Sequence, residues 1–201
     1  MAPNRLVILV NGLPGAGKTT LSRQLAEVLG IPLFCKDMIK ETWADILGSE
    51  PPDGRPQREW NALFGAAASQ TLWNLLAVSP VGGLVDSPLA PRMRHHVEAG
   101  LSGAGVTRPL EVWCDAPAAV ALSRRRGLWP ERHPIHGLMS GANASDSPIA
   151  SASDLSCAGD STEAGASDLV QARPLGLGPV LRVDTTRTVD VGGVAAWCQS
   201  Q

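Results

Sequence analysis

The stretch Leu6-Val-Ile-Leu-Val-Asn-Gly-Leu-Pro-Gly-Ala-Gly-Lys-Thr19 decides the fold of this 201-residue chain. It begins with a run of apolar residues that is typical of a strand buried on both faces of a parallel sheet. After a glycine-rich turn, leucines recur at helical spacing over residues 19–29, and Gly30 follows as a C-cap. The sequence therefore predicts a buried strand, a tight turn and a helix in direct succession.

The turn between this strand and this helix has the spacing of a P-loop, Gly-x-x-x-x-Gly-Lys-Thr. Its glycines allow successive backbone N–H groups to point at phosphates, and the N-terminus of the helix adds a favourable dipole. In such loops the lysine contacts the β- and γ-phosphates, and the Thr hydroxyl can coordinate Mg²⁺. We therefore expect ATP with Mg²⁺ to bind to Gly12, Pro14, Gly15, Ala16, Gly17, Lys18, Thr19 and Thr20.

Strands and helices alternate along the rest of the chain. Short apolar runs predict strands at residues 32–35, 82–86, 110–114 and 178–184. Periodic segments predict helices at residues 38–47, 57–78, 91–102, 116–126 and 189–199. This alternation is typical of an α/β domain, here one domain over residues 1–201, with a parallel five-stranded sheet covered by helices on both faces.

Two later segments have a distinct character. Residues 124–136 contain several arginines, and we expect them to form a lid over the phosphates. In residues 137–168, Ser, Ala, Gly and Asp dominate and large apolar side chains are few. Such a stretch buries too little apolar surface to offset the entropy lost on ordering, so we expect a mobile insertion.

The composition excludes several classes of protein. The net charge of −2 counts against nucleic acid and an anionic membrane as partners. The four cysteines are scattered without a CxxC pair or zinc-finger spacing, which counts against a cysteine-based metal site. The N-terminal apolar run is too short for a signal peptide or a membrane-spanning helix, so we expect a cytoplasmic protein.

Asp37 follows the second predicted strand, at the edge of an open α/β sheet where ligands bind. The residues alone leave two roles open for this carboxylate. It can accept the proton of an attacking hydroxyl, or it can cap a helix that begins at Met38. Lys36 and Lys40 flank it, and they can hold an anionic acceptor or keep the aspartate ionised.

Further polar groups follow the later elements. Asp86 ends the third predicted strand, where it either binds Mg²⁺ through water, contacts the acceptor, or forms a turn. Arginines at 124–126 and 132 either neutralise charge on the transferred phosphoryl group or satisfy a helix C-terminus. Because consecutive helical residues point about 100° apart, the three cannot all face one phosphate. We favour Arg124 and Arg132, with Arg126 next.

Aromatic and histidine side chains near these positions have two interpretations. Trp43 and Trp60 lie on predicted helices, where they either pack in the core or form a platform for the acceptor. His133 and His136 either lie at the surface or contact the nucleotide or the acceptor.

Together these motifs resemble, in their order along the chain, the small P-loop kinases that include chloramphenicol phosphotransferase, zeta toxins and the kinase domain of phage polynucleotide kinase. The motifs are residues 12–20, 36–41, 86, 124–126, 132–136 and 183–186. The resemblance covers most of the chain outside residues 137–168. It implies that Asp37 is the base for the acceptor hydroxyl, that Lys40 contacts the acceptor, and that Thr185 and Thr186 lie beside the adenine.

The sequence thus favours an ATP-dependent phosphotransferase acting on a hydroxyl of a small molecule such as an antibiotic, nucleoside, sugar or metabolite. Thr19 and Asp86 are the expected metal ligands. The expected acceptor site consists of Asp37, Lys40, Asp86, Trp43 and Trp60, and Arg126 and Thr185 are expected to contact the nucleotide. The alternatives are a kinase of nucleic-acid 5′ ends and a nucleotide-dependent switch ATPase. The sequence identifies neither the acceptor nor the oligomeric state.

Overall fold

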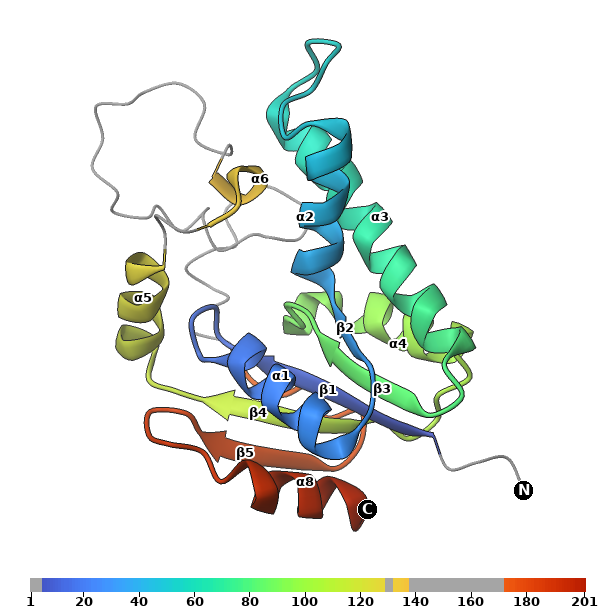
Figure 1. The fold of residues 1–201 in the computed structure, drawn as a ribbon, viewed down its shortest axis with the longest axis vertical. Coiled ribbons are helices and arrows are strands. Elements are labelled where there is room, and N and C mark those ends of the chain that lie inside the picture. The colour runs from blue at the N-terminus through green and yellow to red at the C-terminus, as the bar shows by residue number, and fades with distance from the viewer. Residues whose placement is uncertain (1–4, 129–131, 138–171) are drawn as a thin grey trace.

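The structure is a computed structural model that describes residues 5–128, 132–137 and 172–201. Within these residues, five parallel strands form one sheet in the order β2-β3-β1-β4-β5 (Figure 1). The strands are β1 (Leu6–Gly12), β2 (Leu33–Cys35), β3 (Gly82–Asp86), β4 (Leu110–Asp115) and β5 (Val180–Asp184). The predicted α/β fold with a parallel five-stranded sheet is confirmed. The insertion expected at 137–168 lies, apart from Gly137, outside the described residues.

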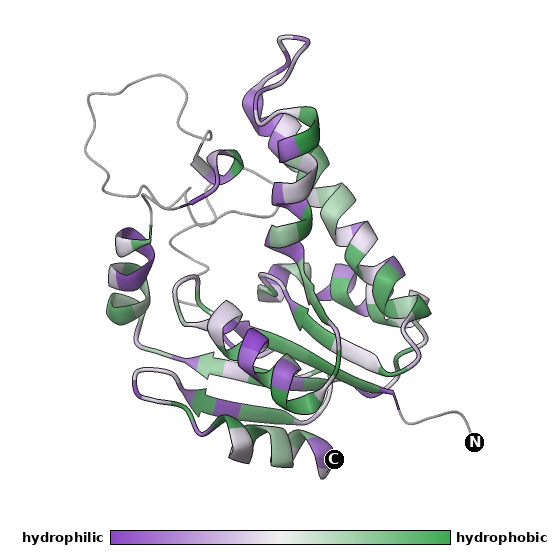
Figure 2. Cartoon of the chain, in the orientation of Figure 1, coloured by the Kyte–Doolittle hydropathy of each residue, from purple (hydrophilic) through white to green (hydrophobic). Residues whose placement is uncertain are grey.

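Helices cover both faces of this sheet (Figure 1). Helices α1 (Lys18–Leu29) and α8 (Val191–Gln199) pack together on one face, and α3 (Gln57–Val78) and α4 (Arg94–Gly103) lie on the other. Along β1, Ile8 and Val10 join the first of these apolar layers, whereas Val7 and Leu9 join the second. This central strand is therefore buried on both faces, in agreement with its continuous apolar run (Figure 2).

Helix α2 (Lys36–Leu47) begins directly where β2 ends and packs against α3 above the carboxyl ends of the strands (Figure 1). The predicted start at Met38 is wrong by two residues. Cys35 occupies the N-cap position, and its side chain makes no capping hydrogen bond. Asp37 lies inside the first turn, so the interpretation of this carboxylate as the helix cap is also wrong.

The remaining elements are short. A 3₁₀ turn, η1 (Pro91–Met93), precedes α4, where one continuous helix was predicted. Helix α5 (Ala118–Gly127) follows β4, and α6 (Pro134–Gly137) forms one turn at the end of the expected lid segment. No helix of the described segments is both long enough and apolar enough to span a membrane.

A buried carboxylate ties the chain ahead of β5 to the centre of the sheet. Glu111 on β4 is 1% exposed, and its Oε1 accepts hydrogen bonds from Asn11 Nδ2 and from the Leu175 backbone N–H, both at 2.9 Å. Its Oε2 accepts from the Gly176 backbone N–H at 2.8 Å. Leu175 is buried in the layer beneath α3 and α4. Glu111 therefore fixes the path by which the chain returns to the sheet.

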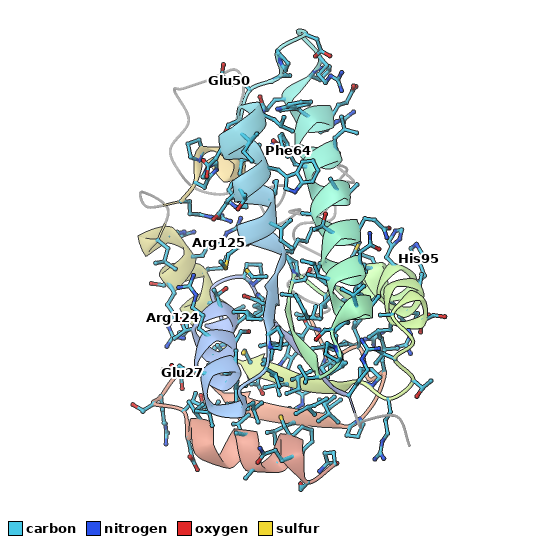
Figure 3. The ribbon with its side chains drawn as sticks, turned by 45° about the vertical axis from the view of Figure 1, so that its right-hand side comes forward. Glu27, Glu50, Phe64, His95, Arg124 and Arg125 are labelled. Atoms are coloured by element: carbon cyan, nitrogen blue, oxygen red, sulfur yellow. The ribbon has the colours of Figure 1, made fainter. Side chains whose placement is uncertain are left out.

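Replacement of Glu111 by alanine is expected to lower the free energy of unfolding by about 3 kcal/mol, since three donors lose their acceptor in a buried place. Urea unfolding followed by circular dichroism measures the change. The control is Glu27→Ala on the exposed face of α1 (Figure 3), which is expected to change stability by at most about 0.5 kcal/mol. A decrease in the free energy of unfolding below about 1 kcal/mol for Glu111→Ala would show that the hydrogen bonds of Glu111 are not needed for stability.

Candidate active site

A cavity of about 830 Å³ opens at the carboxyl ends of the central strands. Ligands of open α/β sheets bind at this edge. The walls come from the loop after β1, the β2–α2 junction, the end of β3, helix α5, and the loop after β5. The predicted site residues that line the cavity are Pro14, Gly15, Gly17, Lys18, Thr19, Thr20, Asp37, Asp86, Arg124, Arg132 and Thr185.

The glycine-rich loop has the backbone of a phosphate cradle. Gly12, Gly15 and Gly17 have φ values of 143°, 85° and 87°, which residues other than glycine rarely adopt. A Cβ atom at Gly15 would lie 2.1 Å from the backbone oxygen of Ala121 on α5, so only glycine lets α5 pack on the loop. Lys18 Nζ donates hydrogen bonds to the carbonyls of Gly12 and Leu13, both at 3.0 Å. The loop and its lysine therefore fit a row of phosphates.

Asp86 and Thr19 both line the cavity beside this loop. Asp86 is 4% exposed. Burial raises the pKa of Asp86, and the nearby Thr19 hydroxyl and the charge of Lys18 oppose this rise. P-loop proteins hold Mg²⁺ with a hydroxyl and a carboxylate together with phosphate oxygens. Thr19 and Asp86 thus fit the donor set that Mg²⁺ requires.

Asp37 lines the same cavity as Lys18. Its position in the first turn of α2 follows from the direct junction with β2, which is anchored by pairing with β3. Cys35, which also lines the cavity, is not a candidate nucleophile. Burial, together with the charge of Asp86, raises the pKa of Cys35 to about 12 and keeps it a thiol.

Arginines approach the cavity from α5 and from the segment around α6. The guanidinium of Arg124 lines the cavity and donates a hydrogen bond to the Thr185 backbone carbonyl at 2.9 Å. Arg125 also lines the cavity, whereas Arg126 is exposed and does not. Arg132 completes the group. Sequence reasoning favoured Arg126 over Arg125, because nothing in the local sequence tells how α5 is rotated about its axis.

Several residues expected at the site lie outside the lining. Lys40 is 7% exposed and shares the buried side of α2 with Lys36 and Ala44. Trp43 is exposed at 41%, and Trp60 Nε1 donates to the Gly48 carbonyl at 3.1 Å. Of the loop residues, Ala16 is fully buried, and Gly12 meets Lys18 through its carbonyl without lining the cavity.

Sequence reasoning missed a row of carboxylates on α2. Asp37, Glu41 and Asp45 are spaced four residues apart, so they lie on one side of the helix. Glu41 Oε1 lies 2.9 Å from His136 Nε2, and Asp45 Oδ1 lies 3.0 Å from His133 Nε2. The spacing could be found in the sequence, but no local signal connects it with histidines so far along the chain.

The fold and the site define a P-loop kinase, with a nucleotide-binding loop at the carboxyl edge of a parallel sheet. Residues 7–127 match the model of a family described as an AAA domain, and this range includes the glycine-rich loop, Asp37 and Asp86. The chain belongs to this AAA-domain family. Shikimate kinase of Symbiobacterium thermophilum is 31% identical over 133 residues, which are 64% of this chain and 68% of that relative.

Solved structures share the fold. A crystal structure of a candidate kinase from Chloroflexus aurantiacus is 28% identical, has a TM-score of 0.72, and matches 98% of this chain and 97% of its own. Shikimate kinase from Acinetobacter baumannii, in complex with shikimate, is 18% identical with a TM-score of 0.54 over 98% of this chain and 92% of its own. The expected kinship with P-loop kinases is confirmed, and the narrower resemblance to chloramphenicol phosphotransferase and zeta toxins stays a prediction.

Proposed function

We propose that this protein is an ATP- and Mg²⁺-dependent phosphotransferase that moves the γ-phosphoryl group to a hydroxyl of a small molecule. The observation that carries this proposal is that Lys18 and Asp37 line one cavity. Transfer to an alcohol needs a group that holds the terminal phosphate and a carboxylate that takes the proton of the attacking hydroxyl. The cavity, at about 830 Å³, is within the size range of small-molecule sites.

Each residue has a separate task in this proposal. The backbone N–H groups of the loop and Lys18 bind the phosphates, and Thr19 and Asp86 would hold the metal ion. When bound, Mg²⁺ neutralises charge on the phosphate oxygens. A carboxylate oxygen of Asp37 accepts the proton of the acceptor hydroxyl while the hydroxyl oxygen attacks the γ-phosphorus. ADP departs with the electron pair of the broken P–O bond.

The arginines act on the charge of the moving group. Arg124 and Arg125 on α5 and Arg132 from the following segment line the cavity, and guanidinium groups there stabilise negative charge on the transferred phosphoryl group. We propose that residues 124–136, of which 129–131 lie outside the described residues, close as a lid, which would exclude water and favour transfer over hydrolysis. Thr185 contributes to the nucleotide side of the cavity.

The relatives support a small acceptor. Shikimate kinase, the relative at 31% identity, is named for a small hydroxylated substrate. The run Lys36-Asp-Met-Ile-Lys-Glu41, which follows β2 without a loop, supports the branch that resembles chloramphenicol phosphotransferase and polynucleotide kinase. The acceptor is therefore sought among antibiotics, nucleosides, sugars and hydroxylated metabolites.

Release of ADP from MgATP tests the proposal. With a panel of antibiotics, nucleosides, sugars and hydroxy acids, including shikimate, one chemical class is expected to raise the rate at least about tenfold above ATP alone. Mass spectrometry should then find the acceptor enlarged by one phosphoryl group. Equal slow ADP release across the panel, from a protein that binds ATP, would point instead to a nucleotide-dependent switch.

A further inference from the structure

The segment 132–137 is attached to α2 by two histidine–carboxylate pairs and one apolar contact. His136 and Glu41 form a pair in which the histidine side chain is 3% exposed and the glutamate side chain 36% exposed. His133 and Asp45 form a similar pair one turn further along α2, with side-chain exposures of 19% and 70%. Between these pairs, Ile135 is fully buried in an apolar cluster with Ala44 and with Phe64, which α3 contributes (Figure 3).

The buried pair lies beside the groups proposed to act in transfer. Burial lowers the pKa of His136, the charge of Asp37 opposes this, and Lys40 and Arg132 lower it further. Asp37 precedes Glu41 by one turn of α2, and Arg132 precedes His136 by four residues in the segment 132–137. Asp37 and Arg132 line the cavity, whereas His136 does not. The His136 imidazole thus lies outside the cavity lining but belongs to the same segment as Arg132.

We propose that the Glu41–His136 pair is a positioning pair for phosphoryl transfer, which orients this segment so that Arg132 faces the phosphates. The inference rests on the proposed function, and it makes His136 a positioning residue, since its side chain does not line the cavity. Burial of Ile135 is non-directional and holds the segment on α2 without fixing its orientation. A hydrogen bond between two partly or fully buried side chains fixes that orientation.

His136 has two ring nitrogens, and the proposal assigns the role to one of them. In the neutral ring, Nε2–H donates to Glu41 at 2.9 Å, and Nδ1 then carries a lone pair. Nδ1 is buried, and none of the residues that the structure describes forms a hydrogen bond with it. If His136 acted as a second base, Nδ1 would be the essential atom. Glutamine separates the two roles, because its amide N–H can replace Nε2–H but nothing in it replaces Nδ1.

Binding of MgADP with and without aluminium fluoride is the test. Aluminium fluoride imitates the phosphoryl group in the transition state of transfer, and its use needs no known acceptor. The affinity gain on adding fluoride measures stabilisation of that group. Arg132→Ala, His136→Ala and Glu41→Ala are each expected to reduce the gain about tenfold or more, with ADP affinity changed at most about threefold. His136→Gln is expected to stay within about threefold of the parent protein.

The exposed pair supplies the matched control. His133→Ala removes a hydrogen bond between the same two elements, yet it is expected to change the fluoride-dependent gain at most about threefold. The double variant Arg132→Ala/His136→Ala should lose no more than Arg132→Ala alone, since both act through one guanidinium. Thermal unfolding shows which variants fold. If His136→Ala does not, Glu41→Ala removes the same hydrogen bond from its more exposed side.

Three outcomes would overturn the inference. First, His136→Ala or Glu41→Ala could leave the fluoride-dependent affinity gain as large as in His133→Ala. Second, the loss of this gain in the double variant could equal the product of the losses in the two single variants. Third, His136→Gln could reduce the gain as much as His136→Ala. In each of these cases the parent protein still gains affinity from fluoride, and the proposed phosphotransferase survives. A parent protein that binds ADP but gains nothing from fluoride would contradict both proposals.

Discussion

Replacing Asp37 by asparagine is expected to lower the turnover of acceptor-dependent phosphoryl transfer by about 10²–10⁴, while the affinity for ATP changes at most about threefold. Asparagine keeps the size of the side chain but cannot take the proton of the acceptor hydroxyl. The phosphates are held by the loop and by Lys18, which the substitution leaves intact. Steady-state ADP release and calorimetric titration with ATP measure the two quantities separately.

The matched control is Asp45→Asn, two turns along the same side of α2. That carboxylate is 70% exposed and pairs with His133 outside the cavity, so turnover is expected to change at most about threefold. Turnover of Asp37→Asn within about tenfold of the parent would contradict the role of general base. If Lys18→Ala nevertheless abolished function, the protein would act as a nucleotide-dependent switch.

Lys18→Ala is expected to lower kcat/KM by about 10³ or more, and to weaken ATP binding as well. The Lys18 ammonium contacts the phosphates in the ground state and also stabilises the charge that develops during transfer. Its removal therefore lowers both the affinity for ATP and kcat/KM. In this structure Lys18 Nζ lies 3.0 Å from the carbonyl oxygens of Gly12 and Leu13, inside the cradle. Titration with ATP and steady-state kinetics test the two effects.

Arg23→Ala is the control for removal of a cation from α1. Arg23 is exposed, lies on the same helix, and does not line the cavity, so both ATP affinity and kcat/KM are expected to stay within about twofold. Unchanged ATP affinity and activity in Lys18→Ala would show that the loop does not bind phosphates in the proposed way.

The central strand, the loop and α1 could be predicted because the information that specifies them is local. An apolar run, fixed glycine spacing and a leucine stripe lie within residues 6–29. The start of α2 was placed two residues late, since no turn residue marks the point where β2 becomes a helix. That short error changed the interpretation of Asp37, which belongs to the first turn and not to a cap.

Contacts between distant segments could not be predicted. His136 and Glu41 are 95 residues apart and His133 and Asp45 are 88 apart, and a carboxylate row on one helix does not name its partners. The same holds for Glu111, whose carboxylate oxygens accept hydrogen bonds from backbone N–H groups 64 and 65 residues later in the chain. The choice between Arg125 and Arg126 depends on how α5 packs, which is settled by its contact with the loop and not by its own sequence.

The contact between Gly15 and Ala121 makes the phosphate loop and the arginine helix one mechanical unit. The loop approaches the backbone of α5 so closely at Gly15 that only a hydrogen atom fits there. A Cβ at this position would lie 2.1 Å from the Ala121 oxygen. A side chain at position 15 would act as a wedge and push the guanidinium groups of Arg124 and Arg125 away from the nucleotide.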